Sequence, residues 1–207
     1  MTHSADLAGA LARLMTTDYL ANARTVIGIA GESGSGKSVT AAELARALGT
    51  EGRTSAVLHQ DDYFHRPPRT NHEHRERDLQ SVGPQEVDLD RLASHIALFR
   101  DGRDDVTVPS VDYPGNRFLT RRADFSAAGI LIVEGTYVLT LADLDVRIFL
   151  EATSMATRER RRLRNRDIDA PFVEQVLAIE HTLIAPQAMS ADVVIDGEFR
   201  IVRERRR

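Results

Sequence analysis

The sequence predicts an α/β fold in which a mostly parallel sheet carries helices on both faces. The main observation is that short apolar runs, typical of buried strands, alternate with longer segments whose pattern favours helices. Strands separated by helices usually pair in parallel, with the helices covering the sheet. The length of 207 residues, with 42% apolar and 28% charged residues, suits one domain over 1–207.

The first predicted elements surround a glycine-rich segment. Residues 5–19 are expected to form an amphipathic helix inside an N-terminal helical extension over 1–22. The apolar residues recur there at helical spacing, as Leu7, Leu11, Leu14 and Met15. TVIGIA at 25–30 is predicted to be a buried strand, and 37–48 a helix that ends at Gly49.

The middle of the chain is more polar. TSAVLHQ at 54–60 is predicted to be a second strand. Residues 63–84 are polar and contain prolines, so we expect a long mobile loop there. Residues 86–100 return to a helical pattern, and 105–118 favour a short strand followed by a loop.

The last part of the chain repeats the alternation. GILIVEG at 129–135 is the strongest candidate for a buried strand, and DVRIFLE at 145–151 is the next. The remaining predicted elements are an Arg-rich helix over 154–166, a helix over 171–184, and closing strands over 191–196 and 199–202.

Composition excludes several classes of protein. The net charge of −4 argues against a broad nucleic-acid-binding surface. The absence of cysteine excludes disulfides and thiolate metal sites and fits a reducing compartment. The longest apolar runs are too short to span a bilayer, and the N-terminus lacks the features of a signal peptide. We therefore expect a cytoplasmic protein without membrane or nucleic-acid partners.

The segment GESGSGKS at 31–38 carries the strongest chemical signal. It matches G-x-x-x-x-G-K-[ST] between a predicted strand and a predicted helix, which is the context of a P-loop NTPase fold. Lys37 is the only lysine in the sequence. A compact ammonium on a flexible stem suits the β- and γ-phosphates better than a guanidinium does. The predicted phosphate-binding residues are Gly31, Glu32, Ser33, Gly34, Ser35, Gly36, Lys37, Ser38 and Val39.

Two further features separate kinases from other phosphate-binding proteins. Guanine-selective switches need an N-K-x-D segment, which a chain with a single lysine cannot contain. The apolar strand ILIVEG ends in Glu134 rather than in the Asp-Glu pair that is usual in motor ATPases. A carboxylate at that position, together with the Ser38 hydroxyl, suits Mg²⁺. The alternative is that Glu134 is an exposed acid at the end of a strand.

LHQDDYF at 58–64 brings two carboxylates to the end of the second predicted strand. Open α/β sheets bind ligands at the carboxyl edge of their strands. We expect Asp61 to orient and deprotonate an attacking hydroxyl and also to lie near Mg²⁺, with Asp62 in a secondary role. The alternative is a pair that only caps backbone N–H groups.

TRERRRLRNRD at 157–167 places Arg158, Arg162 and Arg166 on nearly one helical face. Such a cluster suits the charge of a transferring phosphoryl group, and a solvated basic helix is the alternative.

The ordered set of motifs resembles the uridine kinase-like branch of P-loop kinases. The matching segments are GESGSGKS, QDDYF, VPSVDYPGNRF, ILIVEGTYVL, RRRLRNRD and ADVVID, between residue 25 and about 196. This branch includes phosphoribulokinase, one class of pantothenate kinase and nicotinamide riboside kinase. The resemblance implies a parallel five-stranded core, a mobile Arg-rich lid over about 153–170, ATP with Mg²⁺ as donor, and a small-molecule hydroxyl as acceptor.

The resemblance also assigns roles by position. Asp61 corresponds to the catalytic aspartate of the family, and Glu134 to its glutamate near magnesium. The implied catalytic residues are Asp61, Lys37, Arg162 and Arg166, and the implied metal ligands are Ser38, Glu134 and Asp61.

The acceptor-binding segments depart from the uridine kinase pattern. Val82 in SVGP stands where uridine kinases carry an aspartate that binds ribose. VDYPGN at 111–116 keeps an aspartate and an aromatic residue but lacks the family's Tyr and His. A nucleoside is expected as acceptor, with nicotinamide riboside or pantothenate as alternatives. The candidate substrate-binding residues are Asp62, Tyr63, Asp112, Tyr113 and Arg117.

A function of a different class remains open at this stage. A regulatory ATPase would bind nucleotide without an acceptor, but it would need neither the carboxylate pair nor the Arg-rich helix. The apolar stripe from Leu7 to Met15 could pack on a second copy of the chain, although we expect it to pack on its own core.

Overall fold

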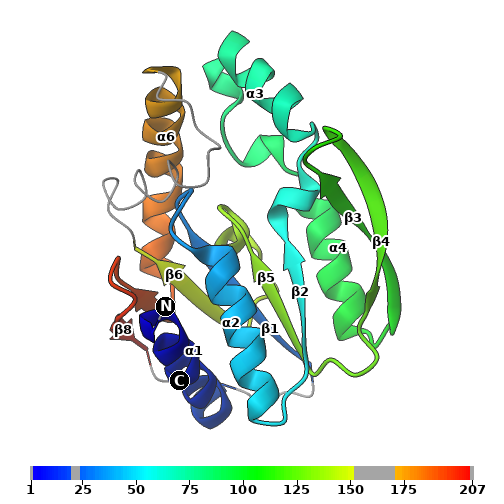
Figure 1. Ribbon diagram of the computed structural model, residues 1–207, viewed down its shortest axis with the longest axis vertical. Helices are drawn as coiled ribbons and strands as arrows, with labels where there is room; N and C mark the ends of the chain where they lie inside the picture. The colour runs from blue at the N-terminus through cyan, green and yellow to red at the C-terminus, as the bar shows by residue number, and fades with distance from the viewer. Residues whose placement is uncertain (1, 20–23, 152–170, 206–207) are drawn as a thin grey trace.

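The computed structural model describes residues 2–19, 24–151 and 171–205. Within this part of the chain, six strands form a sheet in the order β2-β5-β1-β6-β7-β8 (Figure 1). Their bounds are β1 (Thr25–Gly31), β2 (Ser55–His59), β5 (Ile130–Glu134), β6 (Val146–Leu150), β7 (Val193–Ile195) and β8 (Ile201–Glu204). The first five pair in parallel, which confirms the expected parallel core, and β8 adds an antiparallel edge.

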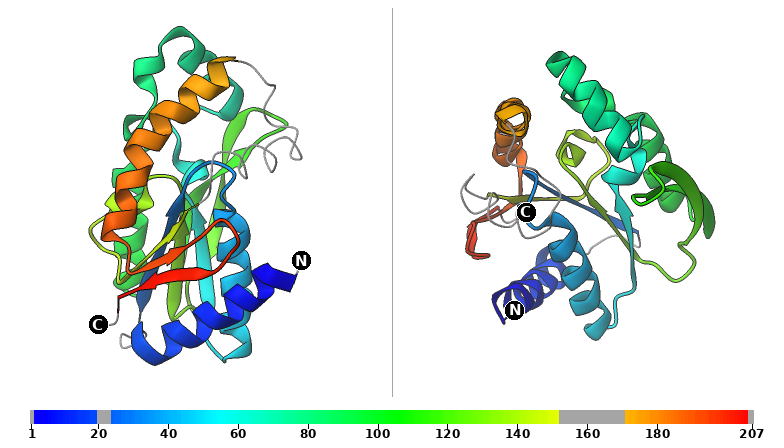
Figure 2. Two further views of the ribbon diagram at one scale, coloured as in Figure 1. Left: turned by 90° about the vertical axis from the view of Figure 1, so that its left-hand side faces the viewer. Right: turned by 45° about the horizontal axis from the view of Figure 1, so that its top comes forward.

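Helices cover both faces of this sheet (Figure 2). One face carries α1 (Thr2–Leu14), which continues as the π-helical turn η1 (Met15–Tyr19), and α2 (Lys37–Thr50). The other carries α4 (Leu89–Arg100), α6 (Pro171–Ile184) and a two-stranded hairpin. The described residues also form short 3₁₀ turns, which are η2 (Gln60–Tyr63), η3 (Leu79–Ser81), η4 (Pro84–Glu86), η5 (Val138–Thr140) and η6 (Ala185–Ser190). Across the described ranges, every helix is too short or too polar to cross a bilayer.

Alternation along the strands divides the core into two layers. In β1, Val26 and Ala30 pack toward α4, whereas Ile27 and Ile29 pack toward α1 and α2. Leu11 and Met15 are fully buried in the layer beneath α1 and α2, and Leu7 is nearly so. The stripe on the first helix therefore packs on the core of its own chain, as expected.

The segment 63–84 was expected to be a mobile loop, and that expectation is wrong. It contains α3 (Pro68–Arg77), which begins with proline at its first position, where the missing N–H costs nothing. Only Asn71 of this helix is buried. Its residues therefore lack the apolar periodicity that identifies a helix in a sequence, and contacts with distant residues hold it instead.

The segment from 105 onward also differs from the expected short strand and loop. It forms a hairpin of β3 (Asp105–Asp112) and β4 (Arg117–Asp124), paired in register from Asp105 with Asp124 to Asp112 with Arg117. The strand β4 was missed because RFLTRRAD is rich in charge and mostly exposed. The hairpin turn includes Asn116, which has a φ of 49°.

The sheet order brings three predicted functional segments to one edge. Because β2, β5 and β1 are neighbours, their carboxyl ends lie side by side. The glycine-rich segment follows β1, the carboxylate pair follows β2, and Glu134 ends β5. In the register of the sheet, Glu134 lies between Ile29 and His59.

Candidate active site

The loop after β1 has the backbone shape that phosphate binding requires. Gly34 and Gly36 have φ values of 80° and 102°, in the region that glycine adopts with the least strain. Gly36 is the N-cap of α2, and Lys37 is its first residue. Successive amide groups of such a loop and the positive end of the helix together favour an anion at this position.

Two contacts fasten this loop. Lys37 Nζ donates a hydrogen bond of 3.0 Å to the carbonyl oxygen of Glu32, which holds the ammonium group across the loop. The Glu32 carboxylate in turn lies 2.5 Å from His181 Nδ1 on α6. The loop is thus connected to the helix that follows the expected lid.

Glu134 is the centre of a small polar cluster. It is buried, and its Oε1 accepts a 3.0 Å hydrogen bond from Ser38 Oγ and lies 2.7 Å from His59 Nδ1. Burial alone raises the pKa of Glu134, but the hydrogen bond with His59 and the charge of Lys37 outweigh it and lower that pKa. The hydrogen bond with Glu134 correspondingly raises the pKa of His59. Glu134 is therefore ionised.

These oxygen donors fit a magnesium ion. Mg²⁺ is usually bound by one or two carboxylates together with substrate phosphates and water, and rarely by a complete protein cage. Ser38 and Glu134 supply a hydroxyl and a carboxylate beside the phosphate loop. Asp61 borders the same groove, so the three expected metal ligands lie around one space. In the described part of the chain, no group of three or more His, Asp or Glu side chains is arranged so that it could hold a metal ion.

The two neighbouring aspartates have different surroundings. Asp61 is exposed, and its Oδ2 accepts a 3.2 Å hydrogen bond from the hydroxyl of Tyr113. Asp62 is 8% exposed, and its Oδ1 accepts a 2.8 Å hydrogen bond from the backbone N–H of Val111. Burial raises the pKa of Asp62. Asp62 thus joins η2 to β3, whereas Asp61 is accessible to a ligand.

Asp61 lies where two cavities meet. An open groove of about 790 Å³ is bordered by Ser38, His59, Asp61, Tyr113 and Glu134 among others. A second cavity of about 200 Å³, here called the α3–α6 cavity, is bordered by Ser33, Asp61, Asn71, Arg75, Tyr113 and Glu180 among others. Asp61 and Tyr113 border both. A ligand in the α3–α6 cavity would therefore lie beside both Asp61 and Ser33 of the phosphate loop.

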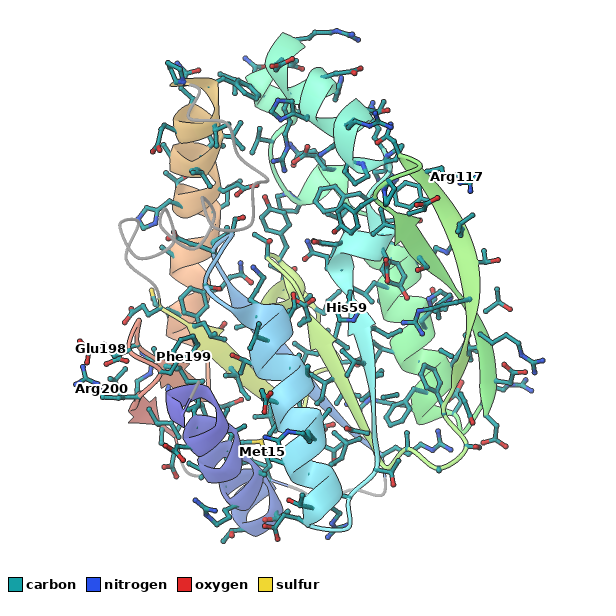
Figure 3. All side chains as sticks on the ribbon, in the orientation of Figure 1. Met15, His59, Arg117, Glu198, Phe199 and Arg200 are labelled. Atoms are coloured by element: carbon teal, nitrogen blue, oxygen red, sulfur yellow. The ribbon has the colours of Figure 1, made fainter. Side chains whose placement is uncertain are left out.

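Three of the predicted substrate-binding residues lie elsewhere. Tyr63 is 2% exposed in the core, where its hydroxyl lies 2.7 Å from His95 Nδ1, and it borders neither cavity. Asp112 and Arg117 pair with each other at 3.0 Å in the hairpin turn and border neither cavity. Figure 3 shows Arg117 at the outer edge of the hairpin, away from His59 beside β5.

The expected lid lies outside the described residues. This applies to 153–170 and therefore to Arg162 and Arg166. The helix that follows, α6, is described, and it contributes Glu180 to the α3–α6 cavity and His181 to the phosphate loop.

Several site residues were missed by sequence reasoning. His59 could have been found, because it ends β2 directly opposite Glu134 in the parallel register. A cluster of three charged residues gave no signal, because Arg75, Glu86 and Glu180 come from α3, η4 and α6. Arg75 donates from Nε and Nη2 to the two Glu86 oxygens at 2.7 Å each, and its Nη2 lies 3.1 Å from Glu180 Oε1.

Comparison with known proteins identifies relatives over most of the chain. A profile of the Phosphoribulokinase / Uridine kinase family matches residues 26–198. A uridine kinase from Staphylococcus carnosus is 33% identical over 196 residues, which cover 84% of this chain and 88% of that protein. A solved structure described as a possible uridine kinase from Bacillus stearothermophilus has the same fold, with a TM-score of 0.67 at 21% identity. It covers 91% of this chain and 97% of its own.

Another relative is named as a kinase of sucrose rather than of uridine. The bifunctional α-galactosidase/sucrose kinase of Mediterraneibacter gnavus is 33% identical over 201 residues, which covers 90% of this chain. The chain spans 22% of the length of that bifunctional protein.

Proposed function

The chain belongs to the phosphoribulokinase/uridine kinase family, and from this premise we propose that Asp61 activates a hydroxyl of a small molecule for phosphorylation by ATP. Family membership supports an ATP-dependent phosphotransferase. The observation that carries the proposal is the position of Asp61 between the phosphate-loop groove and the α3–α6 cavity. A carboxylate there can accept the proton of a hydroxyl that approaches the γ-phosphate.

The donor side of the site holds the triphosphate. Loop amides and Lys37 bind the phosphate oxygens, and the first turn of α2 adds its positive end. Ser38 and Glu134 would hold Mg²⁺, which neutralises charge on the transferring phosphoryl group when bound. His59 keeps Glu134 oriented through the 2.7 Å contact. Arg162 and Arg166 are proposed to complete the charge stabilisation.

The first proposed class of acceptor is a nucleoside. It is supported by the uridine kinase relative, which matches over 88% of its own length. Tyr113 borders both cavities and could contact a base or a sugar. Nicotinamide riboside and pantothenate remain alternatives within the same mechanism.

A second proposed class of acceptor is a carbohydrate. It is supported by the sucrose kinase relative, whose match covers 90% of this chain. Val82 is 4% exposed and borders neither cavity, so its departure from the uridine kinase pattern does not choose between the two classes of acceptor.

An acceptor panel tests the proposal. Consumption of ATP in the presence of Mg²⁺ would be measured without an acceptor and with uridine, cytidine, nicotinamide riboside, pantothenate, sucrose or D-fructose. The proposal expects one compound to stimulate turnover by at least about 100-fold and to appear as a phosphate ester. Slow hydrolysis that no acceptor stimulates would instead indicate a regulatory ATPase.

A further inference from the structure

The phosphate loop at 31–38 contains a carboxylate of its own. Glu32 is the second residue of this loop, and its backbone carbonyl accepts the hydrogen bond from Lys37 Nζ. The Glu32 side chain is partly buried, with 19% of its surface exposed. Like charges repel more strongly where water is partly excluded than they do in bulk water. The charge of Glu32 therefore opposes the binding of phosphate groups, which is the proposed task of this loop.

Two other carboxylates near Lys37 are each paired with a basic side chain. Glu134 Oε1 lies 2.7 Å from His59 Nδ1, and Glu180 Oε1 lies 3.1 Å from Arg75 Nη2. Burial raises the pKa of Glu180, and the charges of Arg75 and Lys37 oppose this rise. Each of these two carboxylates thus has a partner that reduces its repulsion of a bound phosphate group.

Glu32 is paired in the same way with a residue far away in the chain. His181 belongs to α6, which lies beside the loop that follows β1 (Figure 1), and its Nδ1 lies 2.5 Å from Glu32 Oε1. A carboxylate only accepts hydrogen bonds, so Nδ1 of His181 carries the hydrogen of this contact. The His181 side chain is 63% exposed, and ion pairs so open to solvent contribute little to global stability. The consequence of this pair is therefore to be sought in the loop itself.

Two physical effects of this pair make different predictions. If the hydrogen bond only tethers the loop to α6, losing either Glu32 or His181 has the same consequence. If His181 instead offsets the charge of Glu32, losing His181 exposes the phosphate groups to an uncompensated carboxylate, whereas losing Glu32 removes the repulsion at its source. The offset is favoured by the position of Glu32 within an anion-binding loop, and by the basic partners of the two neighbouring carboxylates.

We propose that His181 is a positioning residue that offsets the charge of Glu32 and thereby allows the phosphate loop to bind a triphosphate tightly. This inference rests on the proposed function for the identity of the ligand, a nucleoside triphosphate. His181 acts through Glu32, touches no reacting atom and takes no part in the transfer of the phosphoryl group. Its loss should therefore raise the KM for ATP and leave kcat within about threefold of the wild-type value.

Calorimetric titration tests this role without an acceptor and without turnover. His181→Gln would be titrated with a non-hydrolysable ATP analogue and with tripolyphosphate, both in the presence of Mg²⁺. Affinity for both probes should fall by about 10-fold, because the repulsion acts on phosphate groups and not on the base. The melting temperature should stay within about 3 °C of the wild-type value. The matched control is His72→Gln, since His72 is an exposed histidine of α3 that pairs with Glu76.

A double-mutant cycle with Glu32→Gln separates the offset of charge from a tether. The double variant should bind both probes within about threefold of the wild type, and Glu32→Gln alone should bind them more tightly than the wild type does. A double variant as weak as His181→Gln, or an unchanged affinity in folded His181→Gln, would overturn the inference. Weaker binding by Glu32→Gln would also overturn it, whether or not His181→Gln folds. The expected affinities without phosphorylation of any acceptor would contradict the kinase proposal and leave this inference standing.

Discussion

At the scale of single residues, the surroundings of a side chain decide which of two similar groups can do chemistry. Asp61 and Asp62 are adjacent in η2 and identical in type. Asp62 is held by the N–H of Val111 and is buried, whereas Asp61 is exposed beside Tyr113 and borders both cavities. These surroundings support our proposal that Asp61, and not Asp62, activates a substrate hydroxyl.

The variant Asp61→Asn tests this assignment. It removes the proton acceptor and keeps the side-chain volume, so turnover should fall by about 10²–10⁴-fold. Nucleotide affinity should stay unchanged, because Asp61 is not part of the phosphate loop. Steady-state kinetics and nucleotide titration would measure both, with Asp90→Asn on α4 as the matched control. Turnover above a tenth of the wild-type value would contradict the assignment.

At the scale of elements, α3 is held in place by the hairpin turn. Asn116 Oδ1 accepts a 2.8 Å hydrogen bond from the N–H of Arg69, and its Nδ2 donates to Thr70 Oγ1 at 3.1 Å. Asn116 also adopts a left-handed backbone conformation, with a φ of 49°. The side chain of Asn116 thus binds the first turn of α3, and the backbone of the same residue closes the hairpin.

Two substitutions of Asn116 separate these contributions. Asn116→Gly removes the hydrogen bonds but suits the backbone, so it should destabilise the protein by about 0.5–1.5 kcal/mol. Asn116→Ala adds the left-handed strain and should cost about 1 kcal/mol more. In urea unfolding, the free energy of unfolding should decrease in the order wild type, Asn116→Gly, Asn116→Ala. An alanine variant as stable as the glycine variant would show that the backbone strain is absent.

At the scale of the whole molecule, one helix connects the two halves of the site. The adjacent residues Glu180 and His181 of α6 contact Arg75 of α3 and Glu32 of the phosphate loop, respectively. The core below is divided into two layers by the sheet. The candidate site therefore lies at the sheet edge, and α6 reaches from the α3–α6 cavity to the phosphate loop.

Global stability should depend on pH through His95, which lies beneath this site. Burial and the charge of Arg91 lower the pKa of His95, whose Nδ1 lies 2.7 Å from the hydroxyl of Tyr63. The unfolded chain then binds the proton more readily than the folded protein. The stabilisation is complete above about pH 6.5 and is lost as the pH falls below it.

Thermal unfolding of the wild type and His95→Gln measures this dependence. The wild type should be the more stable at neutral pH, and the difference in melting temperature should shrink as the pH is lowered to about 5.5. A difference that does not vary with pH would show that His95 does not change its protonation. The pKa of His59 is raised, so its contribution to stability changes with pH in the opposite direction. Because the wild type and His95→Gln both contain His59, this contribution cancels in the comparison.

The parts of this protein that the sequence predicts are those held by local interactions. The strand β1, the loop at 31–38 and α2 follow one another directly, so glycine spacing and apolar pattern suffice to predict their shape. The parallel core and Glu134 at the end of β5 follow from apolar runs and strand order. The helix α3 and the strand β4 could not be predicted in this way, because their polar residues are stabilised by partners far away in the chain.

By itself, the sequence determined a phosphate loop on a parallel sheet with carboxylates at its edge, because each of those features resides in one short segment. Only the tertiary structure decided that Asp61 is exposed and borders both cavities whereas Asp62 is buried and borders only the groove, that Tyr63 belongs to the core, and that Glu180 meets Arg75. The physical reason is that burial and pairing arise between segments that the fold brings together, and neither property is contained in any one of them.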